Sequence, residues 1–297
     1  MPASGHPERP GRAGRALTRR RVAPFLLVSA FAAPPADAGV AAPERIAALA
    51  PSAVEIVVAL GAAPRLVGVS DFVSDVPEVA RLPRLGGFTP DLERVLALKP
   101  DLVVVSADGT DRASFERLIS LGLPVVVTSG RTLDGVLADI RAVGAAIGGT
   151  AAAIALVAKL SARIAAAESR AALRAGPPSR VLVVIWPDPA VVAGPGTFIG
   201  DLLRRARLVN VVPKNAGDWP RVSPEVLAAW NPDLVIHPVT SENEGAFRAA
   251  FRPDVRWKFV PAVRDGRVAS LPGGLLERPG PGLVDALERL AALPGMP

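Results

Sequence analysis

Few residues in this chain could carry covalent or metal chemistry. The 297 residues include no cysteine, no tyrosine and only two histidines, His6 and His237. Thiolate catalysis, disulfide bonds, cysteine-based zinc or iron–sulfur sites and tyrosine-ligated haem are therefore excluded. Because the two histidines stand far apart, one of them near the N-terminus, a metal site built from several histidines is not expected.

An acyl-transfer enzyme would need a nucleophile with a general base, and the sequence holds no Gly-x-Ser-x-Gly elbow to present one. His237 follows an apolar run at residues 234–236, and sites in α/β proteins gather at the carboxyl ends of strands. It can either face a cleft or be a structural histidine, and the second is the commoner case. An exported α/β hydrolase is thus a much weaker alternative than a binding function.

Two glutamates occupy matching places in a repeated pattern. Residues 89–104 resemble residues 223–236, and Glu93 and Glu225 lie 132 positions apart, as do Pro100 and Pro232. In each copy a Thr-Pro or Ser-Pro start predicts a short helix, a Pro-Asp turn ends it, and an apolar strand follows. An acid in the first helical turn favours the helix dipole. The matched pair nevertheless indicates a function that uses both carboxylates.

The elements that position these residues alternate between short apolar runs and helical patterns, which is typical of parallel α/β architecture. A helix of about six turns is predicted over residues 150–173, where there is no glycine or proline. We therefore predict two Rossmann-like α/β lobes, residues 39–148 and 177–297, joined by one long backbone helix within 149–176. The predicted strands are residues 45–49, 66–69, 102–105, 125–128, 181–186, 234–236 and 268–271.

Residues 1–38 have the features of a cleavable export signal. They carry a net charge of +4 out of the chain's +6, an apolar stretch at 22–33 that is too short to span a bilayer, and a small-residue cleavage site at 36–38. A basic tail or an anchor helix is the alternative, and Arg19-Arg20 leaves open the general and the twin-arginine routes. With no cysteine to lipidate, the mature chain is expected to be free in the periplasm. Its small residual charge, without a basic run interleaved with aromatics, argues against nucleic-acid binding.

Several motifs follow the order and spacing found in one family over nearly the whole mature chain. They resemble periplasmic substrate-binding proteins of the cobalamin and iron-siderophore ABC-importer class, whose two lobes are joined by a backbone helix. The segment Trp-Pro-Arg-Val-Ser at 219–223 and the paired glutamates look most like the cobalamin-binding members. The matching stretches are residues 49–55, 68–72, 86–93, 98–103, 193–199, 219–223 and 278–281.

This resemblance implies a ligand cleft between the lobes and a role for each matching residue. Glu93 and Glu225 match the acids that dock on the two permease subunits, and two equivalent charges suit a two-fold partner. Aromatic faces offer a macrocycle apolar contact, and an Arg or Glu at the rim can bond amide side chains. The ligand-binding residues carried over are Phe72, Phe88, Trp186, Trp219, Glu277 and Arg278.

The implied ligand is a corrinoid, either cobalamin or a precursor, and it is cargo rather than a resident cofactor. We expect no catalytic residue and no metal site in the protein. The expected partner is the permease dimer of an ABC importer, and the binding protein itself is expected to be a monomer. Phe72 stands where Tyr is common, Phe88 is shifted by one position, and Gly274 falls near a position where cobalamin binders can have an acid. These departures keep a ferric siderophore or haem as alternatives.

Two local motifs have simple structural interpretations. Gly194-Pro195-Gly196-Thr197 lacks the Gly-Lys-Ser/Thr core of a phosphate loop, so Thr197 is predicted to be a helix N-cap. Ser52 with Glu55 three residues later is predicted to form a capping box.

Overall fold

The computed structural model describes residues 41–73, 76–240, 243–252 and 256–294, so the predicted export signal lies outside the described residues. Each of the seven predicted strands is present, with its ends within three residues of the prediction. They are β1 (Ile46–Ala48), β2 (Leu66–Val69), β3 (Leu102–Ser106), β4 (Val125–Thr128), β5 (Arg180–Pro187), β9 (Leu234–Val239) and β10 (Val268–Pro272). Three shorter strands were not predicted: β6 (Ala190–Val192), β7 (Val209–Asn210) and β8 (Arg221–Val222).

The strands form two sheets that share one parallel order. The first sheet runs β2-β1-β3-β4, and every pairing in it is parallel. In the second sheet β5 pairs in parallel with β7 and β9, and β9 pairs with β10, which gives the order β7-β5-β9-β10. The antiparallel strands β6 and β8 extend this sheet from the carboxyl half of β5. The predicted α/β fold with two lobes is therefore confirmed.

The sequence repeat is also a structural repeat. Glu93 is the second residue of α2 (Leu92–Ala97) and Glu225 is the second residue of α7 (Pro224–Trp230). Just beyond these helices Lys99 and Asn231, again 132 positions apart, have positive φ angles of 47° and 44°. One detail of the prediction is wrong: α2 begins two residues after its Thr-Pro pair, because the Asp91 side chain caps it by accepting from the backbone N–H of Arg94.

Matching hydrogen bonds join the C-terminal end of the short helix to the start of the first strand in both lobes, and we call this set of bonds the arginine corner. The Arg45 guanidinium donates to the carbonyl of Leu98 at the end of α2 (2.6 Å), and that of Arg180 donates to the carbonyl of Trp230 at the end of α7 (2.8 Å). The carboxylate of Asp101 accepts from the Arg45 backbone N–H (2.9 Å), and that of Asp233 accepts from the N–H of Arg180 (2.8 Å). Each arginine thus satisfies carbonyls that the helix leaves unpaired.

Alternate residues along each central strand face opposite layers of helices. In β1, for example, Ile46 and Ala48 face one core and Ala47 faces another. In the first lobe α1 (Pro51–Ala59) and α4 (Leu133–Ala146) cover one face, and α2 with α3 (Arg112–Ser120) cover the other. In the second lobe α6 (Phe198–Arg205), α10 (Gly274–Glu277) and α11 (Leu283–Ala291) cover one face, and α7, α8 (Glu244–Ala250) and α9 (Pro261–Arg264) the other.

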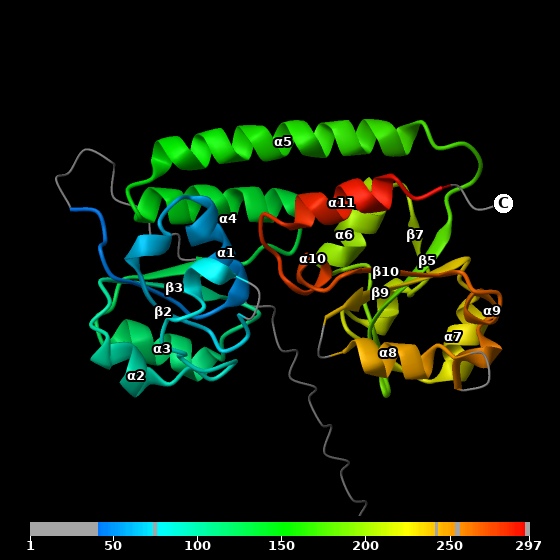
Figure 1. Ribbon diagram of the computed structural model, residues 1–297, viewed down its shortest axis with the longest axis horizontal. Helices are drawn as coiled ribbons and strands as arrows, with labels where there is room; N and C mark the ends of the chain where they lie inside the picture. The colour runs from blue at the N-terminus through cyan, green and yellow to red at the C-terminus, as the bar shows by residue number, and fades with distance from the viewer. Residues whose placement is uncertain (1–40, 74–75, 241–242, 253–255, 295–297) are drawn as a thin grey trace, which may run out of the picture. The chain divides into compact units, whose positions relative to one another are not determined.

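The predicted connecting helix is α5 (Thr150–Ala172), and it packs on α4 of the first lobe and α11 of the second (Figure 1). Its buried residues recur every three or four positions: Ala153, Val157, Leu160, Ile164, Ala167 and Ala171. By length and hydropathy α5 could also cross a membrane. Its buried stripe belongs to the protein core, and Arg163 on the helix bonds Glu288 of α11 (2.7 Å), so we assign it to the fold.

One hydrophobic core runs from the first lobe to the second on the α5 side of both sheets. An arginine network reinforces it, because Arg205 of α6 pairs with Asp134 of α4 (2.6 Å), Glu168 of α5 (2.7 Å) and Asp201 of α6 (2.9 Å). Asp201 also accepts from the backbone N–H of Leu133 at the start of α4 (3.0 Å). Burial acts to raise the pKa of Asp201, but these hydrogen bonds and charges hold it below its ordinary value.

Candidate functional site

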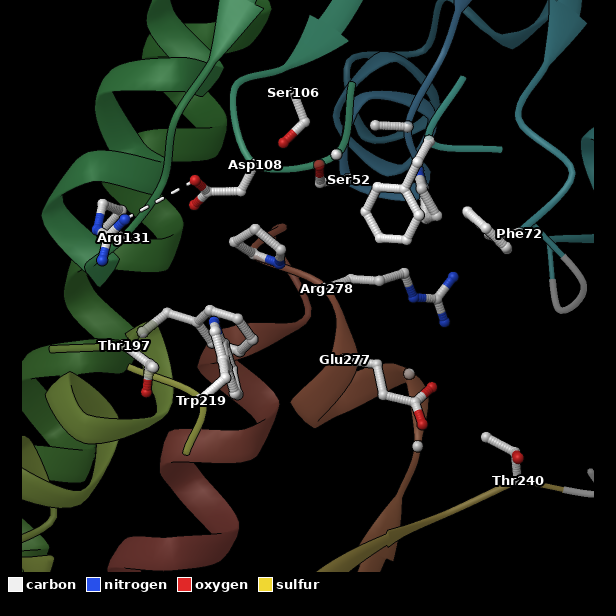
Figure 2. Close-up of a pocket in the computed structure, with 18 of the residues that line it drawn as sticks. Ser52, Phe72, Ser106, Asp108, Arg131, Thr197, Trp219, Thr240, Glu277 and Arg278 are labelled. Carbon is white, nitrogen blue, oxygen red and sulfur yellow. Dashed lines mark ion pairs between the residues drawn. The ribbon is translucent and has the colours of Figure 1, made fainter. Parts of the chain in front are cut away.

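A cavity of about 890 Å³ among the described residues is lined by both lobes. That volume lies at the upper end of the ~300–1,000 Å³ range of small-molecule sites. Most of the lining follows the carboxyl ends of β1, β2, β3, β4, β9 and β10, where ligands bind in open parallel sheets. Figure 2 shows Ser52, Ser106 and Asp108 on one side of the cavity, with Trp219, Glu277 and Arg278 across from them.

Each lobe contributes a pair of aromatic rings to the cavity. In the first lobe Phe72 and Phe88 meet edge to face, with ring centroids 5.4 Å apart. The Phe72 ring lies against the backbone of Gly87, where a Cβ atom would collide with it. In the second lobe Trp219 and Phe198 lie 6.0 Å apart. Phe72, Phe88 and Trp219 are 54%, 61% and 45% exposed, so their ring surfaces are open to a ligand.

The loop that presents Trp219 is fixed by its neighbours. The backbone N–H of Gly194 donates to the carbonyl of Asp218 (2.7 Å). A Cβ atom at Gly194 would collide with the backbone carbonyl oxygen of Gly217, so this close approach of two backbone segments requires glycine. Thr197 caps α6 by accepting from the N–H of Gly200 (3.1 Å), which confirms that prediction.

A charged cluster occupies one end of the cavity. Arg131, which follows β4 in the first lobe, forms an ion pair with Asp218 of the second lobe, and its guanidinium lies 3.8 Å from the carboxylate of Asp108 (Figure 2). The backbone before Arg131 is held by Asp139 of α4, whose carboxylate accepts from the N–H of Ser129 (3.0 Å). Burial raises the pKa of Asp139 to about 6, against the hydrogen bonds from Ser129 and Gly130 that lower it.

The capping-box prediction for Ser52 is wrong. Helix α1 begins at Pro51 with Ala50 in the N-cap position, and no side chain caps it. Ser52 lies in the first turn and lines the cavity instead. Glu55 accepts from the backbone N–H of Gly282 (3.0 Å), which connects α1 to the start of α11.

The structure brings together five of the six predicted ligand-binding residues. Phe72, Phe88, Trp219, Glu277 and Arg278 all line the cavity, and so does Gly274. Trp186 is not among the lining residues. It lies at the end of β5, 44% exposed, and its indole N–H donates to the carbonyl of Asp188 (2.9 Å).

The predicted docking glutamates lie elsewhere. Glu93 and Glu225 are exposed, in the first turns of α2 and α7, and neither lines the cavity. His237 is buried and stacks on Phe247 at a centroid distance of 4.4 Å, so it has the structural role that was the commoner alternative. Burial lowers the pKa of His237, which keeps the imidazole neutral at neutral pH.

Polar lining residues that the sequence alone did not single out for the site are Ser52, Ser106, Asp108, Arg131, Thr197, Asp218 and Thr240. Among the described residues that line the cavity there is no histidine, methionine, cysteine or tyrosine. Within the part of the chain that the structure describes, no group of three or more His, Cys, Asp or Glu side chains is placed to hold a metal ion. The cavity can thus offer aromatic contact and polar bonding to an organic ligand.

The profile of the family described as "Periplasmic binding protein" matches residues 46–275, which is most of the chain. The chain therefore belongs to this family. It is a substrate-binding protein of an ABC importer, in the class that serves cobalamin, haem and siderophores, and not an enzyme. A permease and a small-molecule ligand are the partners that this class implies.

Individual relatives carry two kinds of ligand in their names. A cobalamin-binding protein of Halobacterium salinarum is 30% identical over 257 residues, covering 84% of this chain and 69% of the relative. The structure of the periplasmic vitamin B12 binding protein of Vibrio cholerae matches with a TM-score of 0.75 at 25% identity, covering 84% of this chain and 95% of the other. A periplasmic haem-binding protein of Pseudomonas aeruginosa matches equally well, with a TM-score of 0.75 at 30% identity, covering 84% and 92%.

Proposed function

We propose that this protein binds a corrinoid, cobalamin or a precursor such as cobinamide, and delivers it to the permease of an ABC importer. The observation that carries the proposal is the chemistry of the cavity lining. Three exposed aromatic rings, Phe72 and Phe88 of the first lobe and Trp219 of the second, line a volume of about 890 Å³, and the described lining residues include no side chain that commonly ligates haem iron. A corrinoid carries its metal inside its own macrocycle, so it needs contact and hydrogen bonds rather than a protein ligand.

The two aromatic pairs suit a broad, flat ligand held between the lobes. Phe72 and Phe88 would contact it from the first lobe and Trp219 from the second, where the buried Phe198 packs beside Trp219. Ser52 and Ser106 of the first lobe and Thr240 of the second supply hydroxyls to the same cavity. The corrin ring carries amide side chains around its edge. Such a ligand therefore needs aromatic contact with the face of its ring and hydrogen-bond donors and acceptors around the edge.

Haem is the second candidate, favoured by the similarity to the haem-binding protein of Pseudomonas aeruginosa. The chain has no tyrosine, and His237 is stacked in an aromatic cluster away from the lining. Axial ligation of haem iron by this chain would therefore need another group. A ferric siderophore is the third candidate of the class, and the described lining favours it less because two cations, Arg131 and Arg278, stand against three acidic residues.

Glu93 and Glu225 are the groups that we propose for docking on the permease. They are exposed on short helices at equivalent places of the repeat, outside the cavity. Two equivalent carboxylates, one in each lobe, fit basic residues on two related permease subunits. In this scheme the monomer presents one docking acid per lobe while the ligand stays in the cavity.

We further propose that residues 1–38 are removed on export and that the mature protein is free in the periplasm without lipid attachment. The basic and apolar sequence of this segment supports the first point, and the absence of cysteine from the chain supports the second. The mature protein then comprises the two lobes, residues 39–148 and 177–297, and the connecting helix.

Isothermal titration calorimetry on the mature protein tests the ligand. Cyanocobalamin, dicyanocobinamide, haem and a ferric hydroxamate siderophore are titrated separately under one set of conditions. We expect one-to-one binding of a corrinoid that is tighter than binding of the other two classes. No heat with either corrinoid, together with saturable binding of haem or the siderophore, would transfer the assignment to that ligand.

A further inference from the structure

The charged end of the cavity is built from both lobes. Arg131 is carried by the loop after β4, and the Asp139 carboxylate anchors that loop through the Ser129 N–H. Its two carboxylate partners come from different places: Asp108 follows β3 in the first lobe, and Asp218 belongs to the glycine-packed loop of the second lobe. The cluster therefore has a fixed position relative to the aromatic walls.

The balance of charge in this cluster is negative. One guanidinium faces two carboxylates, and the remaining charged lining residues, Glu277 and Arg278, balance each other. Among the described lining residues, two cations thus stand against three anions. A ligand carboxylate that reached Arg131 would also approach Asp108 and Asp218, whereas a ligand amide could donate its N–H groups to their oxygens.

We propose that Asp108 and Asp218 are specificity-determining residues that select amide-bearing macrocycles over carboxylate-bearing ones. The inference rests on the proposed corrinoid function and narrows it to corrinoids with amidated side chains. Arg131 is the group that holds the two aspartates together across the lobes, rather than a receptor for a ligand carboxylate. At about 4 Å one unit charge changes an equilibrium by roughly fivefold even in a water-like dielectric, so two aspartates suffice for a substantial selection.

Two corrinoids that share a ring and a metal test this directly. Dicyanocobinamide carries side-chain amides, and dicyanocobyrinic acid carries carboxylates in their place. Calorimetry gives the ratio of their dissociation constants for the wild type and for the double variant Asp108→Asn/Asp218→Asn. We expect the wild type to prefer the amide form, and the double variant to reduce that preference by roughly tenfold or more. The preference should also weaken as ionic strength rises.

Two further variants keep the test specific. Glu44→Gln/Glu78→Gln removes the same two charges at exposed positions outside the cavity lining, so the ratio should stay at the wild-type value. Arg131→Gln removes the cation and leaves the aspartates, so the preference for the amide form should increase. Thermal melts of each variant establish that it is folded.

The outcomes separate the two proposals. If the wild type binds dicyanocobinamide but the aspartate variant keeps the wild-type ratio, the selection by Asp108 and Asp218 is wrong and the corrinoid function stands. A wild type that binds the acid form as tightly as the amide form also overturns the selection. If the wild type binds neither corrinoid while binding haem or a siderophore, the proposed function fails and the inference fails with it.

Discussion

Replacing Trp219 by alanine is expected to weaken corrinoid binding by ~1–3 kcal/mol. The Trp219 side chain is 45% exposed and lines the cavity. A large aromatic side chain buries up to ~250 Å², so roughly 110 Å² of this ring is open to a ligand. At ~25 cal/mol per Å² full coverage gives about 2.8 kcal/mol, and coverage of a third to a half gives about 1 kcal/mol. The corresponding loss in affinity is roughly fivefold to 150-fold.

Calorimetry with dicyanocobinamide measures this loss, and Phe259→Ala is the matched control. Phe259 is also a large exposed aromatic, at 60%, but it lies outside the cavity lining. Its replacement should leave the dissociation constant within twofold of wild type. The reasoning is refuted if Trp219→Ala binds within twofold of wild type, or if Phe259→Ala loses as much affinity as Trp219→Ala.

Tryptophan fluorescence adds a second readout of the same variant. The chain has four tryptophans, of which Trp257 is only 1% exposed and contributes a background that the ligand does not contact. Most of the ligand-induced quenching by contact should therefore come from Trp219 and be lost in Trp219→Ala. Quenching of undiminished amplitude in that variant would place the ligand elsewhere.

Three further predictions concern docking, pH and export. Glu93→Ala/Glu225→Ala should leave corrinoid affinity unchanged and weaken association with the permease by roughly tenfold or more, measured by surface plasmon resonance on the transporter in nanodiscs; transport at the wild-type rate would contradict this. Because folded Asp139 keeps its proton up to about pH 6 and the unfolded chain releases it near pH 4, wild-type stability falls as pH rises between these values. Urea titrations give the free energy of unfolding of Asp139→Asn minus that of the wild type. This difference should rise by ~1–3 kcal/mol from pH 4 to pH 7, and a difference that does not change with pH would refute the prediction. Mass spectrometry of the periplasmic protein should find a mature start near residue 39, whereas an intact Met1 would count against cleavage.

Most of the fold could be predicted because parallel strands covered on both faces give continuous apolar runs. Those runs marked β1 to β4, β5, β9 and β10. The strands β6, β7 and β8 have only two or three residues each, too few to give a periodic signal. The start of α2 was misplaced because Asp91 is a better N-cap than Thr89, and the two lie within two residues of each other.

The aromatic and rim residues of the site were predicted from their resemblance to family motifs. The charged cluster was not predicted, because Arg131 and Asp218 lie 87 residues apart and meet only when the lobes are assembled. Neither residue belongs to a motif that marks it in the sequence. Ser52 was misassigned because its spacing to Glu55 suits a capping box equally well, and the helix begins two residues too early for Ser52 to be the cap.

The core that crosses from one lobe to the other makes the two halves of the protein depend on each other for stability. The shared strand order and the matched arginine corners make the two halves repeats of one architecture. Neither half is nevertheless expected to fold by itself, because α4, α5, α6 and α11 bury their apolar faces in a single cluster. A chain cut near Gly176 would leave each fragment with a complete sheet, but the apolar surface that now lies in the shared core would be exposed to water. The two halves thus repeat one architecture, and because they share one core we expect them to fold cooperatively as a pair.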